Sequence, residues 1–167
     1  MIRARLCRIG WTFWIAALLI AGCASPPRLK QAPDGTDAHW QGRLAMTIAS
    51  DPVQAFSADF ELAGNALAGT LIFSTALGTT LAQVQWDTAG AVLHSGVQTQ
   101  RFASLQHLTQ HLTGTEIPVA SLFAWLQGHE TAADGWQADL GELAQGLLHA
   151  RRESPAPPVD LKIVLQR

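Results

Sequence analysis

The chain has 167 residues, of which 48% are hydrophobic and 14% are charged, so it suits one folded domain with a sizeable core. Its formal net charge is −2. Three of its 11 Lys and Arg residues lie in the first eight positions, which leaves eight against 13 Asp and Glu. This acidic balance argues against nucleic-acid binding, which requires a basic surface.

Residues 1–22 have the pattern of a bacterial lipoprotein signal peptide. Met1–Arg8 is basic, and Ile9–Ile20 is an apolar run of about a dozen residues, too short for a comfortable transmembrane helix. The run ends in Ala21-Gly22-Cys23, which resembles a lipobox. An ordinary signal peptide or an N-terminal anchor helix is the alternative.

The lipobox resemblance implies that Cys23 becomes a lipidated N-terminus, with acyl groups on its sulfur and its amine. Cysteine usage supports this, because Cys7 falls in the leader and Cys23 then has no disulfide partner. Each buried CH₂ of an acyl chain contributes about 0.8 kcal/mol, so several chains make a firm anchor. Ala24 and Ser25 follow, where an Asp would be typical of inner-membrane retention. The resemblance therefore implies an outer-membrane protein that faces the periplasm, with no cofactor beyond these acyl groups.

Residues 23–38 are predicted to comprise the lipidated cysteine and a flexible tether. Pro26, Pro27, Pro33 and Gly35 lie in this stretch and are typical of a linker. The folded domain is predicted to begin near His39 and to cover residues 39–167.

Short strand candidates separated by turn signals follow the tether. The second alternates most clearly, with Phe56 and Phe60 on one face and Asp59 and Glu61 on the other. This period of two is typical of a strand with one solvated face. Tight turns between such strands predict an antiparallel meander with one apolar face. The candidates are Gly42–Ala49, Ala55–Leu62, Leu67–Thr75, Thr80–Trp86, Ala91–Ser95 and Val97–Phe102.

The apolar period then changes to that of two short helices. The first is predicted from an N-cap at Ser104 to a stop at Gly114, and the second from Pro118 to Gly128. Trp125 lies off the apolar stripe of the second helix and is predicted at the rim or at the edge of the core. The stripes contain Leu105, Leu108 and Leu112 in the first helix, and Val119, Leu122, Phe123 and Leu126 in the second.

Three weaker or later strand candidates complete the chain: Gly135–Leu140, Gly146–Arg151 and Val159–Gln166. The predicted fold class is therefore α+β, a curved antiparallel sheet with two short helices across its concave side.

Ser74–Thr79, between the third and fourth strands, is predicted to be a polar loop with Leu77 near its tip. A leucine that stays in water forgoes about 1.5–3 kcal/mol of burial. A single exposed leucine often has no function. An exposed apolar side chain on a protein that is predicted to be membrane-tethered nevertheless makes Leu77 a candidate for membrane contact.

Several segments, taken together and in this order, resemble the LolB family of outer-membrane lipoprotein receptors. They are the lipobox at Cys23, Trp40–Leu44, Ala58–Leu62, Ala76–Thr79 and Ile117–Gly128. No single segment is diagnostic, but the combination is fairly specific and spans most of the chain. The resemblance implies an open, incomplete β-barrel of antiparallel strands, with short helices covering an apolar cavity.

The resemblance also implies transport rather than catalysis. The protein would accept lipoproteins from the periplasmic carrier LolA, shield their acyl chains and insert them into the outer membrane. We expect it to act as a monomer. Leu77, with its neighbours Ala76 and Gly78, matches the family's membrane-insertion loop, although the family commonly has Pro where this chain has Ala76.

Eight apolar side chains are predicted to line the cavity that holds the acyl chains. Spacing alone favours an ordinary core in which they pack against one another; the family resemblance favours a cavity. The eight are Leu44, Met46, Phe56, Phe60, Phe73, Trp86, Phe123 and Leu126.

Signals for catalysis or metal binding are weak. Asp59 and Glu61 could form a carboxylate pair, but an exposed polar face explains them. His107 and His111 are four residues apart, a spacing that can bind metal, but they lack a Glu or Cys partner motif. Arg151-Arg152 could guide an acidic partner or lie near lipid headgroups, but a solvated pair explains it. Two alternatives remain: a structural or assembly lipoprotein that binds a protein partner without carrying lipid, and a lipid-anchored periplasmic hydrolase.

Overall fold

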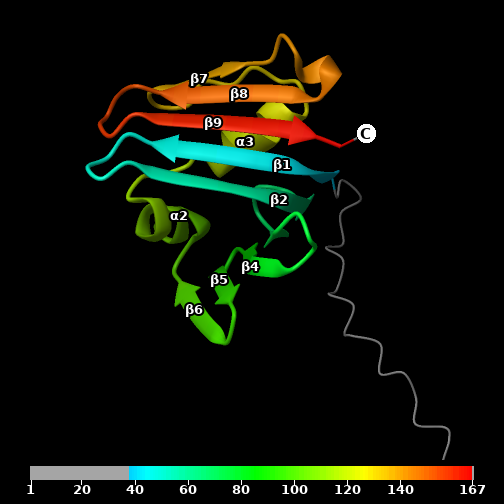
Figure 1. Cartoon of the computed structure of the whole chain (residues 1–167), viewed down its shortest axis with the longest axis vertical. Helices are drawn as coiled ribbons and strands as arrows, with labels where there is room; N and C mark the ends of the chain where they lie inside the picture. Colours follow the sequence, from blue (N-terminus) through cyan, green and yellow to red (C-terminus); the bar gives the residue numbers. More distant parts are fainter. Residues whose placement is uncertain (1–37, 167) are drawn as a thin grey trace, which may run out of the picture. The chain divides into compact units, whose positions relative to one another are not determined.

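The computed structural model describes residues 38–166 (Figure 1). The predicted leader, Cys23 and nearly all of the predicted tether lie outside the described residues. The described strands are β1 (Ala38–Ile48), β2 (Gln54–Gly64), β3 (Gly69–Ser74), β4 (Thr80–Asp87), β5 (Gly90–Ser95), β6 (Gln98–Phe102), β7 (Trp136–Asp139), β8 (Leu147–Arg152) and β9 (Val159–Leu165). The described helices are α2 (Leu105–Thr113), α3 (Val119–Leu126) and a short 3₁₀ helix, η2 (Leu143–Gln145).

These strands form one antiparallel sheet of nine strands in the order β6-β5-β4-β3-β2-β1-β9-β8-β7. β1 to β6 are a meander in chain order, and β9 returns to pair with β1 on its free side. β6 and β7 are the two edges, so the sheet stays open. The predicted α+β class and antiparallel meander are confirmed.

The strand boundaries differ from the prediction mainly at turns. β1 begins at Ala38, four residues before the predicted start, because this end pairs with the far end of β2 from Gly64 onward. Leu67, which was predicted within the third strand, lies instead in the β2–β3 turn and is 71% exposed. There the side chain of Asn65 accepts hydrogen bonds from the backbone N–H groups of Leu67 and Ala68. The turn closed by the Asn65 side chain therefore includes Leu67, and the third strand begins only at Gly69.

The helix boundaries follow the capping signals. The hydroxyl of Ser104 accepts a hydrogen bond from the N–H of His107, and Gly114 ends α2 in the left-handed conformation at φ 67°. Both ends therefore satisfy backbone groups that the helix leaves free. Pro118 stands directly before α3, and the N–H of Gly128 bonds to the carbonyl of Trp125 just after it.

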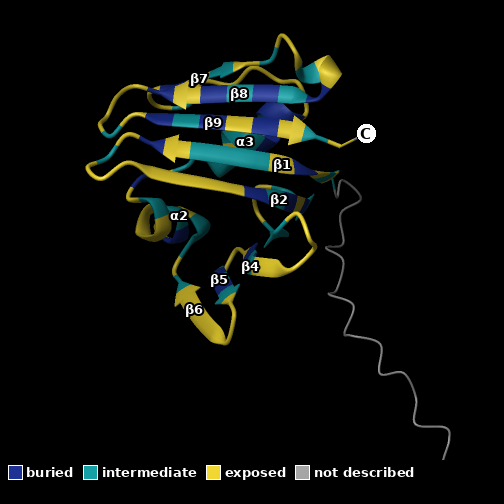
Figure 2. Cartoon of the chain, in the orientation of Figure 1, coloured by how far each residue is buried: buried dark blue, intermediate teal, exposed yellow. Residues whose placement is uncertain are grey.

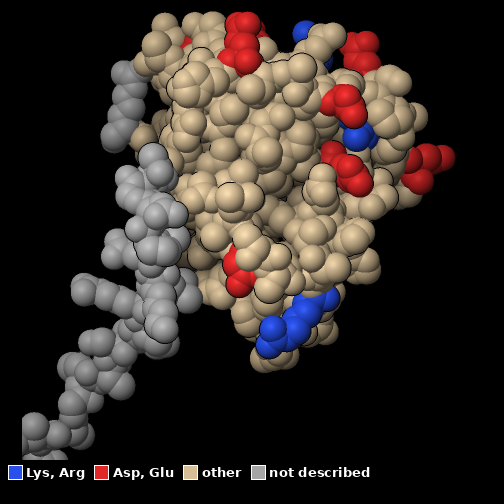
Figure 3. All heavy atoms as spheres, turned by 180° about the vertical axis from the view of Figure 1, so that it is seen from behind, with Lys and Arg blue, Asp and Glu red and all other residues tan. Residues whose placement is uncertain are grey.

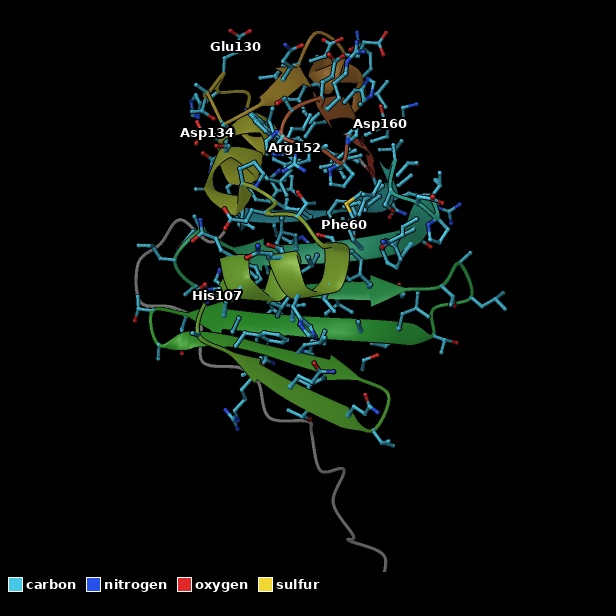
Figure 4. All side chains as sticks on the ribbon, turned by 90° about the vertical axis from the view of Figure 1, so that its left-hand side faces the viewer. Phe60, His107, Glu130, Asp134, Arg152 and Asp160 are labelled. Atoms are coloured by element: carbon cyan, nitrogen blue, oxygen red, sulfur yellow. The ribbon has the colours of Figure 1, made fainter. Side chains whose placement is uncertain are left out.

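The core lies between the sheet and the helices. Figure 2 shows buried residues along β8 and β9 and mostly intermediate burial along β1, whereas β6 and its turn are exposed. In Figure 4 α2 crosses in front of several strands, with His107 at one end of the helix and Phe60 on the sheet. The helices thus cover one face of the sheet and leave the other face to solvent. No helix among the described residues has the length and apolar character needed to span a bilayer.

Candidate functional site

An apolar pocket of about 380 Å³ lies between the two helices and the covered face of the sheet. This volume lies within the usual range for small-molecule sites, about 300–1,000 Å³. The strands contribute Leu44, Met46, Ile48, Gln54, Ala55, Phe56, Phe60, Leu62, Leu71, Phe73, Ala82, Val84, Trp86, Leu93, Leu161 and Ile163. The helical region contributes Leu105, Leu108, Thr109, Leu112, Thr113, Ile117, Val119, Leu122, Phe123 and Leu126.

None of the residues that line the pocket is acidic, basic or a histidine. Its only polar side chains are those of Gln54, Thr109 and Thr113. Both threonine hydroxyls bond to nearby backbone carbonyls. The hydroxyl of Thr109 bonds to the carbonyl of Gln106, and the hydroxyl of Thr113 bonds to the carbonyls of Thr109 and Thr115. A site of this composition offers contact surface for an apolar ligand and no group for acid–base chemistry.

The structure places all eight predicted cavity residues in the lining of this pocket. Phe60, Trp86, Phe123 and Leu126 are buried, whereas Leu44, Met46 and Phe73 are partly buried. Phe56 is 39% exposed. Their use in holding a ligand stays a prediction.

Phe123 stands between two tryptophans and anchors α3 to the sheet. Its ring centroid lies 5.6 Å from that of Trp40 and 6.3 Å from that of Trp86, both in edge-on geometry. Trp86 is held in turn, because its indole N–H donates to the carbonyl of Asn65 at 3.1 Å and its ring lies over Gly69. A Cβ at Gly69 would come within 2.5 Å of that ring. This wall of the pocket therefore depends on the absence of a side chain at Gly69.

The opposite end of the pocket is bordered by Phe56 and Phe73. Their centroids are 5.3 Å apart with planes at 86°, an edge-to-face pair. Because Phe56 lines the pocket and is also exposed to solvent, it lies where the pocket meets the surface. Met46 lines the pocket and pairs with Phe56 across β1 and β2, and a flexible thioether beside aromatic rings suits ligands of variable shape.

The carboxylates that could have formed a catalytic pair are used in surface ion pairs instead. Arg43 Nε donates to Asp59 at 2.9 Å, and His39 Nε2 lies 3.0 Å from a Glu61 carboxylate oxygen. The hydrogen bond to Asp59, and then its charge, raises the pKa of Arg43. All four side chains lie across β1 and β2 on the face away from the pocket, so they support the exposed-face interpretation.

Leu77 is 95% exposed, and its loop is tightly closed. The N–H of Gly78 donates to the carbonyl oxygen of Thr75 at 2.8 Å. The N–H of Thr75 donates to the carbonyl oxygen of Thr79 at 2.9 Å. Gly78 has φ 81°, as a three-residue hairpin loop with a bulge requires. The loop formed by Ala76, Leu77 and Gly78 thus presents an apolar side chain on a short, ordered turn.

The histidine pair and the arginine pair of the sequence have different surroundings in the structure. His107 and His111 are exposed on α2, and His111 lies against the ring of Phe102 at 5.4 Å. No cluster of three or more metal-ligating side chains occurs within residues 38–166. The expectation of a solvated arginine pair is wrong for Arg152, which is 5% exposed, stacks over Trp136 at 5.8 Å and donates to the carbonyl of Pro157. The turn that follows β8 folds back over this side chain.

The sequence predicts Trp125 at the rim or at the edge of the core, and the structure rules out the rim; the prediction also omits part of the pocket lining. Trp125 is 1% exposed, donates to the carbonyl of Thr131 at 3.0 Å and packs on Trp136, so it belongs to the core behind α3. Leu108 and Leu112 of α2 were recognised only as a helix stripe, yet both line the pocket. Leu161 and Ile163 line it from β9, and the alternation of that strand was the available signal.

Figure 3 shows one face of the molecule, on which uncharged residues predominate and the acidic side chains gather mainly toward one end. This face shows few Lys and Arg side chains, which disfavours binding of a polyanion there.

Comparisons with known proteins agree with this geometry. The family model described as "Outer membrane lipoprotein LolB" matches residues 37–153. An "Outer-membrane lipoprotein LolB" of Vibrio cholerae serotype O1 is 32% identical over 131 residues, which cover 72% of this chain and 62% of that protein. One of Shewanella loihica is 28% identical over 127 residues, which cover 72% of this chain and 57% of that protein. The chain therefore spans about six-tenths of the length of these relatives. The match over most of the chain, which includes every pocket strand but β9, shows that the protein belongs to the LolB family of outer-membrane lipoproteins.

Proposed function

We propose that this protein is an outer-membrane receptor that holds the acyl chains of client lipoproteins in its apolar pocket. The proposed receptor takes each client from a LolA-type periplasmic carrier and inserts it into the outer membrane. The observation that carries the proposal is the pocket itself, which is lined almost wholly by apolar side chains and contains no charge. Family membership supports a transport role without catalysis.

The physical reason is the cost of exposing acyl chains to water. Each exposed CH₂ is unfavourable by about 0.8 kcal/mol, so the chains need continuous shielding between two membranes. Phe56 and Phe73 border the pocket where it reaches the surface, and Met46 lies beside them. A handover into this site needs no chemical energy if the acceptor holds the chains better than the donor does.

The proposal extends to the rest of the chain. Residues 1–22 would be removed as a signal peptide, Cys23 would carry the anchoring acyl groups, and residues 24–38 would connect the anchor to the domain. The open sheet with helices over one face would act as an incomplete barrel around the ligand. Leu77, on its closed loop, would enter the membrane surface during delivery.

The test is a transfer assay with a labelled lipoprotein loaded on a LolA-type carrier. The label should move from the carrier to this protein, and then to vesicles. Label that stays on the carrier while this protein is folded would refute the receptor proposal and favour a structural or assembly lipoprotein that carries no lipid.

A matched pair of variants ties the transfer to the pocket. Ala82 lines the pocket, and its neighbour Gln83 does not, because successive residues of β4 point to opposite faces. Ala82→Phe should occupy space in the pocket and reduce uptake of label, whereas Gln83→Phe should leave uptake unchanged. Equal uptake by the two variants would show that the acyl chains bind elsewhere.

A further inference from the structure

The turn between β5 and β6 projects a second fully exposed apolar side chain. Val97 is as exposed as a residue can be, at 103% of its reference area, while Leu77 is 95% exposed. Val97 stands in a two-residue turn between Ser95 and Gln98, which pair with each other. Gly96, at φ 55°, supplies the first position that such a turn requires. The valine is therefore held at the tip of a tight hairpin.

The strand register places this turn at the same end of the sheet as the loop of Leu77. β3 ends at Ser74 and β4 begins at Thr80, while Gln83 near the start of β4 pairs with His94 near the end of β5. The two hairpins are neighbours in the sheet, so their axes are separated by two strand spacings, roughly 10 Å. Figure 4 shows both hairpins projecting on the same side of the molecule.

Leu81, near the start of β4, is a third exposed apolar residue at this end of the sheet. It is 39% exposed, and its carbonyl accepts a hydrogen bond from the hydroxyl of Ser95 at 3.3 Å. This bond ties the start of β4 to the end of β5. Leu77, Leu81 and Val97 are thus three exposed apolar residues at one end of the sheet, which we name the apolar edge.

The apolar edge lies in a part of the chain with almost no charge. Asp87 is the only Asp, Glu, Lys or Arg between Glu61 and Arg101. Asp87 lies at the opposite end of β4, where it pairs with Gly90 and caps the next turn. The β1–β2 turn, which holds Asp51, lies at the same end of the sheet, but the two hairpin turns of the apolar edge carry no Asp, Glu, Lys or Arg. Exposed apolar side chains on uncharged turns suit contact with the surface of a bilayer, where a buried charge is costly.

We propose that the apolar edge is a two-hairpin membrane contact, in which Val97 and Leu81 enter the lipid surface beside Leu77. The partner is a lipid bilayer. The inference rests on the proposed receptor function and adds to it, because two neighbouring hairpins fix the orientation of the sheet on the membrane, whereas one loop would allow it to rotate. A fixed orientation would point the same end of the pocket toward the bilayer at every delivery.

Leu67 provides the matched control. It is also an exposed apolar residue on a hairpin turn, at 71%, but the β2–β3 turn lies at the opposite end of the sheet. The full chain would be reconstituted in vesicles of phosphatidylethanolamine and phosphatidylglycerol, with an environment-sensitive fluorophore on Val97→Cys or on Leu67→Cys. Lipids brominated near the headgroup should quench the probe at position 97 and not the probe at position 67. Equal quenching at the two positions would overturn the proposal.

Delivery of labelled lipoprotein to the vesicles gives a second measurement. Val97→Glu should slow delivery about tenfold, which corresponds to 1.4 kcal/mol, and Leu67→Glu should not. Uptake from the carrier is measured first in each variant. If the unaltered protein takes up no label from the carrier, the receptor function itself is refuted. Normal uptake with normal delivery by Val97→Glu would refute only the two-hairpin contact.

Discussion

Replacing Gly69 with alanine tests how Trp86 is held at the wall of the pocket. The new Cβ would lie 2.5 Å from Cζ2 of Trp86 and 2.5 Å from the carbonyl oxygen of Ala63. Because the backbone of Ala63 blocks one side, the indole must move by about 1 Å to reach an ordinary carbon–carbon contact. The movement draws the indole N–H away from the carbonyl of Asn65, to which it now bonds at 3.1 Å.

The expected cost follows from these contacts. Overpacking costs about 1–3 kcal/mol, and the weakened hydrogen bond costs about 1 kcal/mol more. Replacing glycine also restricts the unfolded chain, which returns about 0.4–1 kcal/mol. We therefore expect Gly69→Ala to lower the free energy of unfolding by about 1–3 kcal/mol, measured by urea denaturation with circular dichroism.

A control and a double-mutant cycle isolate the cause. Gly141→Ala should change the free energy of unfolding by less than about 0.5 kcal/mol. Its Cβ would meet only a carboxylate oxygen of Asp139, at 3.2 Å, and that side chain can move. Trp86→Phe removes the ring atoms that clash, so Gly69→Ala should cost about 1 kcal/mol less in that background. An equal cost in both backgrounds would refute the proposed clash with the indole.

Three further predictions concern the membrane loop, the anchor and the core. Leu77→Glu should change the free energy of unfolding by less than about 0.5 kcal/mol, because the side chain is 95% exposed, and should slow delivery of label to vesicles. Normal delivery would reduce Leu77 to an ordinary exposed leucine. Cys23→Ala behind an ordinary cleavable signal should release the protein from the membrane fraction while uptake of label persists; lost uptake would contradict the separation of anchor and pocket. Trp125→Phe removes the N–H that bonds to Thr131 and should cost about 1 kcal/mol in urea denaturation. Uptake should be unchanged, since Trp125 does not line the pocket, and a fall in uptake would show that the core behind α3 shapes it.

The fold was predictable where local chemistry and tertiary structure agree. Alternation in Ala55–Leu62 placed Ala58, Phe60 and Leu62 on the buried face, as the structure has them. Ser104 and Gly114 gave both ends of α2 because capping depends on the residue itself. The family resemblance is confirmed by the family model and by both relatives.

Other features depend on contacts that a single sequence does not display. Trp125 is off the stripe of its helix, but the segment after the helix folds back so that Thr131 and Trp136 cover it. Arg152 is buried for the same kind of reason, because Trp136 and the turn at Pro157 enclose a side chain that the sequence suggests is solvated. The pairing of β9 with β1 joins residues more than a hundred positions apart and completes the pocket with Leu161 and Ile163. Local periodicity carries no information on such partners.

The direction in which the chain enters the sheet sets a length requirement on the segment that precedes it. Ala38 pairs with Gly64, so β1 begins at the end of the sheet opposite the apolar edge. β1 has 11 residues and is roughly 35 Å long. The residues between Cys23 and Ala38 number 14 and can extend at most roughly 50 Å. If Cys23 carries the proposed lipid anchor and Leu77 makes the proposed membrane contact, residues 24–37 must cover at least the length of β1 for both to meet one bilayer. On that proposal, the number of residues before Ala38 limits whether the apolar edge can reach the bilayer that holds the anchor.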